Sequence, residues 1–127
     1  MYDVRGLYDY VDGVESSSGG SLSMSDDALV QRIADAVRES DPGAEVFLYG
    51  SRARGRAAPE SDWDILVLSS VPATDDLKRE IRHRVYSIEW DTGQVITCIV
   101  HSRVEWRGYP LRETPFHRRV SREAIRV

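Results

Sequence analysis

The sequence contains one cysteine and no long apolar run. Cys98 alone excludes an internal disulfide and a cysteine-based zinc site, and its apolar surroundings predict a buried, inert thiol. No stretch approaches the ~20 apolar residues that a membrane-spanning helix needs. The first residues also lack the basic start and apolar centre of a signal peptide. We therefore expect a cytoplasmic protein that makes no membrane contact.

An excess of positive charge is also missing. The formal net charge is −4, which argues against nucleic acid as a partner. The 127 residues are 41% hydrophobic and 30% charged, as expected for one globular domain with a single core. Arginine is nevertheless concentrated near the end of the sequence. We expect these side chains to be solvated, with phosphates or an acidic partner as the alternative; they are Arg103, Arg107, Arg112, Arg118, Arg119, Arg122 and Arg126.

The first 24 residues differ from the rest in composition. The run from Ser16 to Ser21 consists only of serine and glycine, which is typical of a flexible linker. Met24 directly precedes a good helix start. We therefore predict a flexible or extension segment over residues 1–24 and one domain over residues 25–127.

Two helical patterns and three strand patterns follow. Apolar residues at helical spacing predict one helix from a cap at Ser25 to the stop at Asp41, and a second from a cap at Thr74 to the stop at Gly93. Short helical candidates begin near Ser102 and after Thr114. Short apolar runs predict strands over residues 46–49, 63–68 and 95–100. This order predicts an α/β (α+β) fold, a small mixed β-sheet with helices packed mainly on one face.

A glycine-serine loop with three arginines follows the first predicted strand. Gly50 has no β-carbon, so the backbone can turn tightly and a ligand can approach closely. Ser51 can donate its hydroxyl, and backbone N–H groups at a helix start bind anions. The three arginines, Arg52, Arg54 and Arg56, add positive charge. The loop is therefore a candidate binding site for a triphosphate.

Two aspartates lie at the start of the second predicted strand. Because side chains on a strand alternate between faces, Asp62 and Asp64 should point to one face and Trp63 to the opposite, core face. The two carboxylates repel each other unless a cation lies between them. Mg²⁺ is the natural candidate, since it binds one or two carboxylates together with substrate phosphates.

The two motifs together resemble a known signature. Gly50-Ser51-x-Ala53-Arg54-Gly55 followed by Ser61-Asp62-x-Asp64-Ile65 is similar to the motif of the DNA polymerase β-like nucleotidyltransferases, above all their minimal nucleotidyltransferase branch. The resemblance implies transfer of a nucleotide, usually AMP from ATP, to a hydroxyl of a protein or small molecule. It implies that Gly50 and Ser51, with Arg54 nearby, bind the triphosphate. It also implies that Asp62 and Asp64 hold Mg²⁺ and carry the chemistry.

One departure from this family concerns its third carboxylate, which lies on a later strand. Here that strand contains no acid, and we expect Thr97 to face the two aspartates. A threonine is no base near neutral pH. His101 is a candidate general base, although a half-exposed histidine at a strand end is the simpler interpretation. The remaining candidates, each more simply a surface residue, are Glu89, Asp91 and Glu105.

Two further functions therefore stand beside the enzyme. Small members of the resembled branch often pair with a HEPN-type helical protein, frequently a toxin ribonuclease, and act as its antitoxin, sometimes by adenylylating a tyrosine. The short chain agrees with that role, because no acceptor-binding domain is evident. The missing acid agrees with a degenerate nucleotide-binding module that has little or no catalysis. A second copy of the chain is a further candidate partner.

Overall fold

The computed structural model describes residues 24–127, which begin with helix α2 (Met24–Ser40). The helix starts at Met24, so Ser25 lies within it and does not cap it as expected. Aspartates in the first turn and Arg38 in the last complement the helix dipole. The helix ends before Asp41, as predicted. The prediction for residues 1–24 falls almost entirely outside the described residues.

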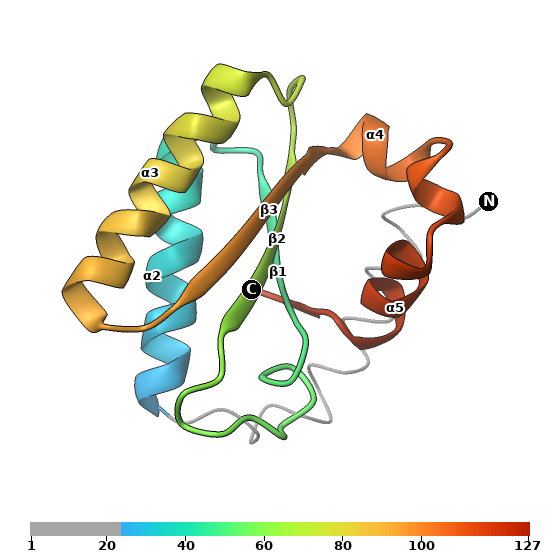
Figure 1. Cartoon of the computed structure of the whole chain (residues 1–127). Coiled ribbons are helices and arrows are strands. Elements are labelled where there is room, and N and C mark those ends of the chain that lie inside the picture. Colours follow the sequence, from blue (N-terminus) through green and yellow to red (C-terminus); the bar gives the residue numbers. More distant parts are fainter. Residues whose placement is uncertain (1–23) are drawn as a thin grey trace.

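The second long helix, α3 (Asp75–Thr92), has both predicted ends. Thr74 Oγ1 accepts a hydrogen bond from Leu77 N at 3.2 Å, which caps the helix start. Gly93 closes the helix in the left-handed conformation, with φ of 72°. Helices α2 and α3 pack against each other on one face of the sheet (Figure 1).

The sheet has four strands in the order β3-β2-β1-β4. The strands are β1 (Glu45–Tyr49), β2 (Trp63–Ser69), β3 (Ile96–Ser102) and β4 (Ile125–Arg126). Strand β2 pairs parallel with β3 and antiparallel with β1, and β1 pairs antiparallel with β4. The mixed α/β fold predicted from the sequence is therefore confirmed. Strand β4 was not predicted, because two residues give no periodic pattern.

The alternation of side chains along the strands creates two apolar layers. Val46, Leu48, Ile65 and Val67 belong to the cluster that packs under α2 and α3. The other cluster contains Phe47, Tyr49, Leu66, Leu68, Trp106 and Val120. The long helices thus cover one face as expected, while three short helical segments pack on the other: α4 (Arg103–Arg107), η1 (Leu111–Glu113) and α5 (Pro115–Glu123) (Figure 1).

The arginine-rich end of the chain is folded onto this second face. Six of its seven arginines are exposed, in line with the expected solvation. Arg103 differs, because its Nε lies 2.6 Å from Oε1 of Glu45, which is only 2% exposed. His117 is buried and stacks on Trp106 at 4.1 Å between ring centroids, and its Nε2 lies 3.0 Å from Trp106 O. Burial lowers the pKa of His117.

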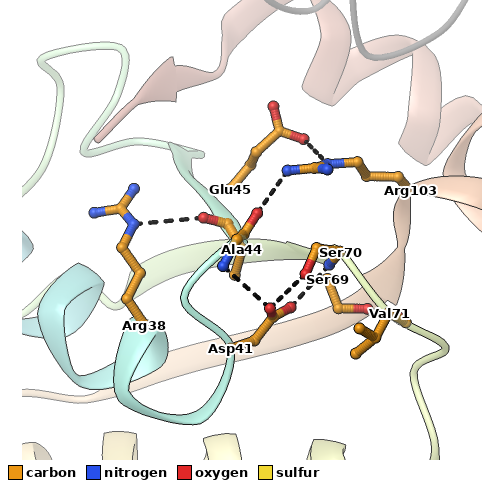
Figure 2. A network of polar contacts seen from close by, with 9 residues as sticks. Arg38, Asp41, Ala44, Glu45, Ser69, Ser70, Val71 and Arg103 are labelled. Carbon is orange, nitrogen blue, oxygen red and sulfur yellow. Dashed lines mark hydrogen bonds and ion pairs between the residues drawn. The ribbon is translucent and has the colours of Figure 1, made fainter.

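A polar network fastens one end of the sheet (Figure 2). Asp41, at the end of α2, accepts hydrogen bonds from Ser70 N at 2.8 Å and from Gly43 N at 3.2 Å. Arg103 joins Glu45 at the start of β1 and also donates to Gly43 O. The network lies where β1 begins and β2 ends, so its buried carboxylates are at the opposite end of the sheet from Asp62 and Asp64.

Among residues 24–127, no helix is long and apolar enough to span a bilayer.

Candidate functional site

The loop after β1 turns back on itself through backbone hydrogen bonds. Arg54 N donates to Gly50 O at 3.1 Å, and Arg56 N donates to Ser51 O at 3.0 Å. The loop therefore consists of consecutive turns, and its N–H groups do not lie at the start of a helix. The hydroxyl of Ser51, which is half-buried, makes no hydrogen bond within the described part of the chain. That hydroxyl is therefore available to a ligand.

Arg52 holds the loop closed. Its guanidinium donates to Pro59 O at 3.1 Å and to Ser61 O at 2.8 Å, and it lies 4.1 Å from the centroid of the Trp63 ring. Trp63 is 1% exposed, which confirms its predicted place in the core, and its Nε1 donates to Gln94 Oε1 at 3.0 Å. Arg52 thus has a structural role, and the arginines left for a ligand are Arg54 and Arg56.

Gly50 brings this loop against the aspartate pair. Its φ is +79°, and a β-carbon at this position would lie 2.2 Å from Oδ2 of Asp64. Such a distance is shorter than any van der Waals contact, so a β-carbon would displace the Asp64 carboxylate, and the positive φ favours glycine independently. Asp64 pairs with Tyr49 across β1 and β2, while Asp62 is exposed just before β2. The two sequence motifs therefore meet at one end of the sheet.

Several negative charges lie close together at this end of the sheet. Burial raises the pKa of Asp64, and the carboxylates of Asp62 and Glu123 raise it further, against the opposing effect of Arg119 and Arg54. Burial and the negative charge of Asp64 also raise the pKa of Tyr49 to about 12. Arg119 and Arg54 therefore offset the negative charge around Asp64 only in part.

Thr97 lies where the sequence placed it. It pairs in register with Asp64 across the parallel strands β2 and β3, and it is exposed. Because paired residues of neighbouring strands point to the same face, Thr97 stands beside Asp64 where an acid was expected. Within residues 24–127, no group of three or more His, Cys, Asp or Glu side chains has the geometry to hold a metal ion.

The residues considered as substitutes for the missing acid lie away from Asp64 or are engaged in other contacts. His101 pairs in register with Leu68, near the far end of β2, about 13 Å along the strand from Thr97. The hypothesis that His101 is the general base is therefore wrong. Glu89 accepts a hydrogen bond from Ile96 N at 2.9 Å, Asp91 pairs with Arg32, and Glu105 caps α4 through Ser102.

A different acid, Glu123, reaches the site from the end of α5. Its Oε2 accepts a hydrogen bond from Gly50 N at 2.6 Å, and its Oε1 lies 3.0 Å from Nη1 of Arg54. Arg119 on the same helix lies close enough to Asp64 to lower its pKa. Sequence reasoning missed Glu123, because 73 positions separate it from Gly50 and no local pattern marks it. Arg119 was named only as one of the seven arginines expected to be solvated.

A hollow of about 640 Å³ lies elsewhere, between α3 and β3. Its lining includes Arg82, Tyr86 and Cys98 but none of the motif residues. Cys98 points to the face opposite that of Thr97, and burial raises the pKa of its thiol to about 12, in agreement with the expected inert thiol. This hollow is therefore separate from the candidate site.

Comparison with known proteins agrees with the fold. One solved structure, a crystal structure of a toxin–antitoxin with AMP-PNP, is similar with a TM-score of 0.52 and 17% identity, covering 76% of this chain and 69% of that chain. At that identity the similarity concerns the fold. No curated protein matches the chain. The model of the nucleotidyltransferase domain matches residues 30–123, so this chain belongs to the nucleotidyltransferase domain family of the DNA polymerase β-like superfamily.

Proposed function

We propose that this protein transfers AMP from ATP to a hydroxyl group, in a reaction that depends on Mg²⁺. The observation that carries the proposal is the contact between Gly50 and Asp64, which holds a phosphate-binding type of loop against a carboxylate pair. In the reaction, the acceptor oxygen forms a bond to the α-phosphorus and the bond from that phosphorus to the bridging oxygen breaks. Pyrophosphate leaves, and the hydroxyl proton is released to solvent.

The loop supplies the groups that would hold the triphosphate. Gly50 N–H and the Ser51 hydroxyl can donate to phosphate oxygens, and Arg54 adds a cation beside them. The absence of a β-carbon at Gly50 lets the phosphates approach the backbone. These residues position ATP, so that its α-phosphorus faces the acceptor hydroxyl.

The aspartates fit a divalent cation. Burial raises the pKa of Asp64 and the negative charge of Asp62 raises it further, and a bound cation would relieve this repulsion between like charges. Asp62 and Asp64 would hold Mg²⁺, together with phosphate oxygens of the substrate. When bound, the ion would stabilise negative charge that develops on the phosphates. The two side chains would fix its place beside the loop that holds the phosphates.

The acceptor that we propose is a side-chain hydroxyl of a HEPN-like helical protein partner, with this chain as its antitoxin. The motif resemblance to the minimal nucleotidyltransferase branch supports this role, and so does the similar fold of a toxin–antitoxin structure with AMP-PNP. A small-molecule hydroxyl is the alternative acceptor. The partner is tested by co-expression with the product of a neighbouring reading frame, followed by mass analysis for an added AMP.

A second candidate function is nucleotide binding with little or no transfer. The observation that favours it is Thr97, which stands beside Asp64 where the family has an acid. A protein of this kind would bind ATP and act through its partner. The two functions differ in whether the α-phosphorus is ever attacked, so they separate in a labelling experiment.

The test uses ATP labelled at the α-phosphate, with Mg²⁺ and a cell lysate. Transfer predicts label on an acceptor with the wild-type chain and none with the Asp62→Asn, Asp64→Asn double variant. A matched control is the Asp75→Asn, Asp76→Asn double variant, which removes the same charge from the first turn of α3. Equal labelling by wild type and the site variant would exclude the enzyme. ATP binding without label would favour the second function.

A further inference from the structure

The carboxylate of Glu123 occupies the groups that the proposed function assigns to phosphate. Its Oε2 lies 2.6 Å from Gly50 N, and its two oxygens lie 3.0 and 3.1 Å from Nη1 of Arg54. The Glu123 side chain is 13% exposed, so it is largely shielded from water. A triphosphate cannot accept a hydrogen bond from Gly50 N–H while Glu123 remains in place, and it would have to share the guanidinium of Arg54 with that carboxylate.

The position of Glu123 is unfavourable for the helix that carries it. Glu123 is the last residue of α5, at the negative end of the helix dipole, where a cation stabilises a helix and an acid does not. Glu123 is also one of the negative charges that raise the pKa of Asp64. The acid is therefore held in place by Gly50 and Arg54, against the preference of its own helix.

Gly50 is the point where Glu123 and Asp64 meet. Its N–H contacts Glu123, while the position of its missing β-carbon is filled by Asp64 Oδ2. The two carboxylates therefore lie on neighbouring sides of a single residue. On the other side of Asp64, β3 offers only Thr97. A third acid thus lies within electrostatic reach of Asp64, although it comes from α5 and is bonded to Gly50 and Arg54.

We propose that Glu123 is the third carboxylate of this site and that ATP binding releases it. In the nucleotide-free chain Glu123 accepts a hydrogen bond from Gly50 N–H and forms an ion pair with Arg54. The triphosphate replaces the carboxylate at both groups. The released side chain would then help Asp62 and Asp64 to hold Mg²⁺, as an anionic ligand that Thr97 cannot supply. The inference rests on the proposed function, since it needs a nucleotide at this loop.

The proposal predicts two effects of opposite sign for Glu123→Gln. Without divalent cation, ATP should bind about tenfold more tightly, because a charge-assisted hydrogen bond to the binding groups no longer competes. With nucleotide present, the Mg²⁺ concentration needed for half-saturation should rise about tenfold, because one anionic ligand is lost. If the ion pair of Glu123 were purely structural, its loss would weaken both ATP binding and Mg²⁺ binding, or it would change neither of them.

The experiment measures ATP affinity by calorimetry in EDTA and then titrates Mg²⁺ into the ATP complex, with the full chain throughout. Glu60→Gln is the matched control, because Glu60 is an exposed acid in the same loop region. It removes the same charge, so an effect of general electrostatics would appear in both variants. We expect less than a twofold change for Glu60→Gln in either measurement.

The outcomes separate the inference from the function on which it rests. If wild type and Glu123→Gln bind ATP equally well, Glu123 does not compete with phosphate and the inference fails alone. If ATP affinity rises while the Mg²⁺ requirement stays unchanged, Glu123 is not a third carboxylate and the inference also fails. If neither chain binds ATP even with Mg²⁺ present, the proposed function fails as well. Glu123→Asp is the alternative variant if Glu123→Gln does not fold. Its shorter side chain keeps the charge but withdraws from Gly50, so it should also tighten ATP binding.

Discussion

The backbone of Gly50 lies so close to Asp64 that a β-carbon at position 50 would lie 2.2 Å from Oδ2 of the aspartate. This contact fixes the distance between the loop and the carboxylate pair. Although 13 residues separate Gly50 from Asp64 in the sequence, the contact makes the two motifs parts of one site. The loop can approach the pair only where no side chain intervenes.

Gly50→Ala should therefore both destabilise the fold and remove ATP binding. A left-handed φ costs an alanine about 1–2 kcal/mol, and the clash with Asp64 adds to that cost. Gly93→Ala is the control, because Gly93 has a similar φ of 72° and a β-carbon added there would have no atom within 4 Å. Denaturant unfolding and ATP-dependent thermal shift should show a larger loss for Gly50→Ala. Equal loss of stability in both variants would mean that Asp64 moves aside.

Thr97→Asp should strengthen Mg²⁺ binding in the presence of ATP. Thr97 stands beside Asp64 and is exposed, so a carboxylate there completes the pair from β3 at little steric cost. We expect at least a fewfold lower Mg²⁺ requirement and faster transfer. Thr97→Asn, of the same size but uncharged, should change neither. If the two variants behave alike, the strand position does not face the bound ion.

Arg103→Ala should lower the free energy of unfolding by about 2–3 kcal/mol, because it leaves the carboxylate of Glu45 buried without its cation. The estimate is below the range for a fully buried pair, since the Arg103 side chain is 33% exposed. Arg79→Ala removes an exposed ion pair with Asp76 and should cost less than ~0.5 kcal/mol. Urea unfolding of both variants measures the contrast. A small loss at Arg103 would show that water replaces the guanidinium.

His117 should make the fold less stable as the pH falls. Its pKa in the folded chain is lowered by burial, whereas in the unfolded chain it is ~6.5. The unfolded chain therefore takes up the proton first, and the stabilisation, complete above that pH, is lost as the pH falls below it towards the lowered pKa. Urea unfolding from pH 7 to 5 should show this loss. It should be smaller in His117→Gln than in a His83→Gln control, where His83 is exposed on α3.

The sequence predicted those parts of the molecule that depend on local patterns. Caps and apolar spacing located the second helix between Thr74 and Gly93, and period-two alternation placed Trp63 and Asp64 on opposite faces. Contacts between distant segments were not predictable in the same way. Glu123 meets Gly50 only because α5 folds back onto the second face of the sheet, and nothing near either residue in the sequence encodes that packing.

The His101 hypothesis failed for a related reason. Sequence position placed it directly after the third strand, but the parallel register aligns it with Leu68, at the other end of β2 from Asp64. A strand end in the sequence does not say which end of the sheet it occupies. Register, which depends on all the paired residues together, decides that question.

The stacking of Arg52 on Trp63 gives the site an optical reporter. The indole is buried, and the guanidinium 4.1 Å from its ring also holds the loop carbonyls, so a movement of the loop would change the emission of Trp63. Of the other tryptophans, Trp106 is buried on the second face and Trp90 is 75% exposed. With Trp90 replaced by phenylalanine, fluorescence would follow entry of a nucleotide in an unlabelled chain, on the timescale of a stopped-flow mixing experiment.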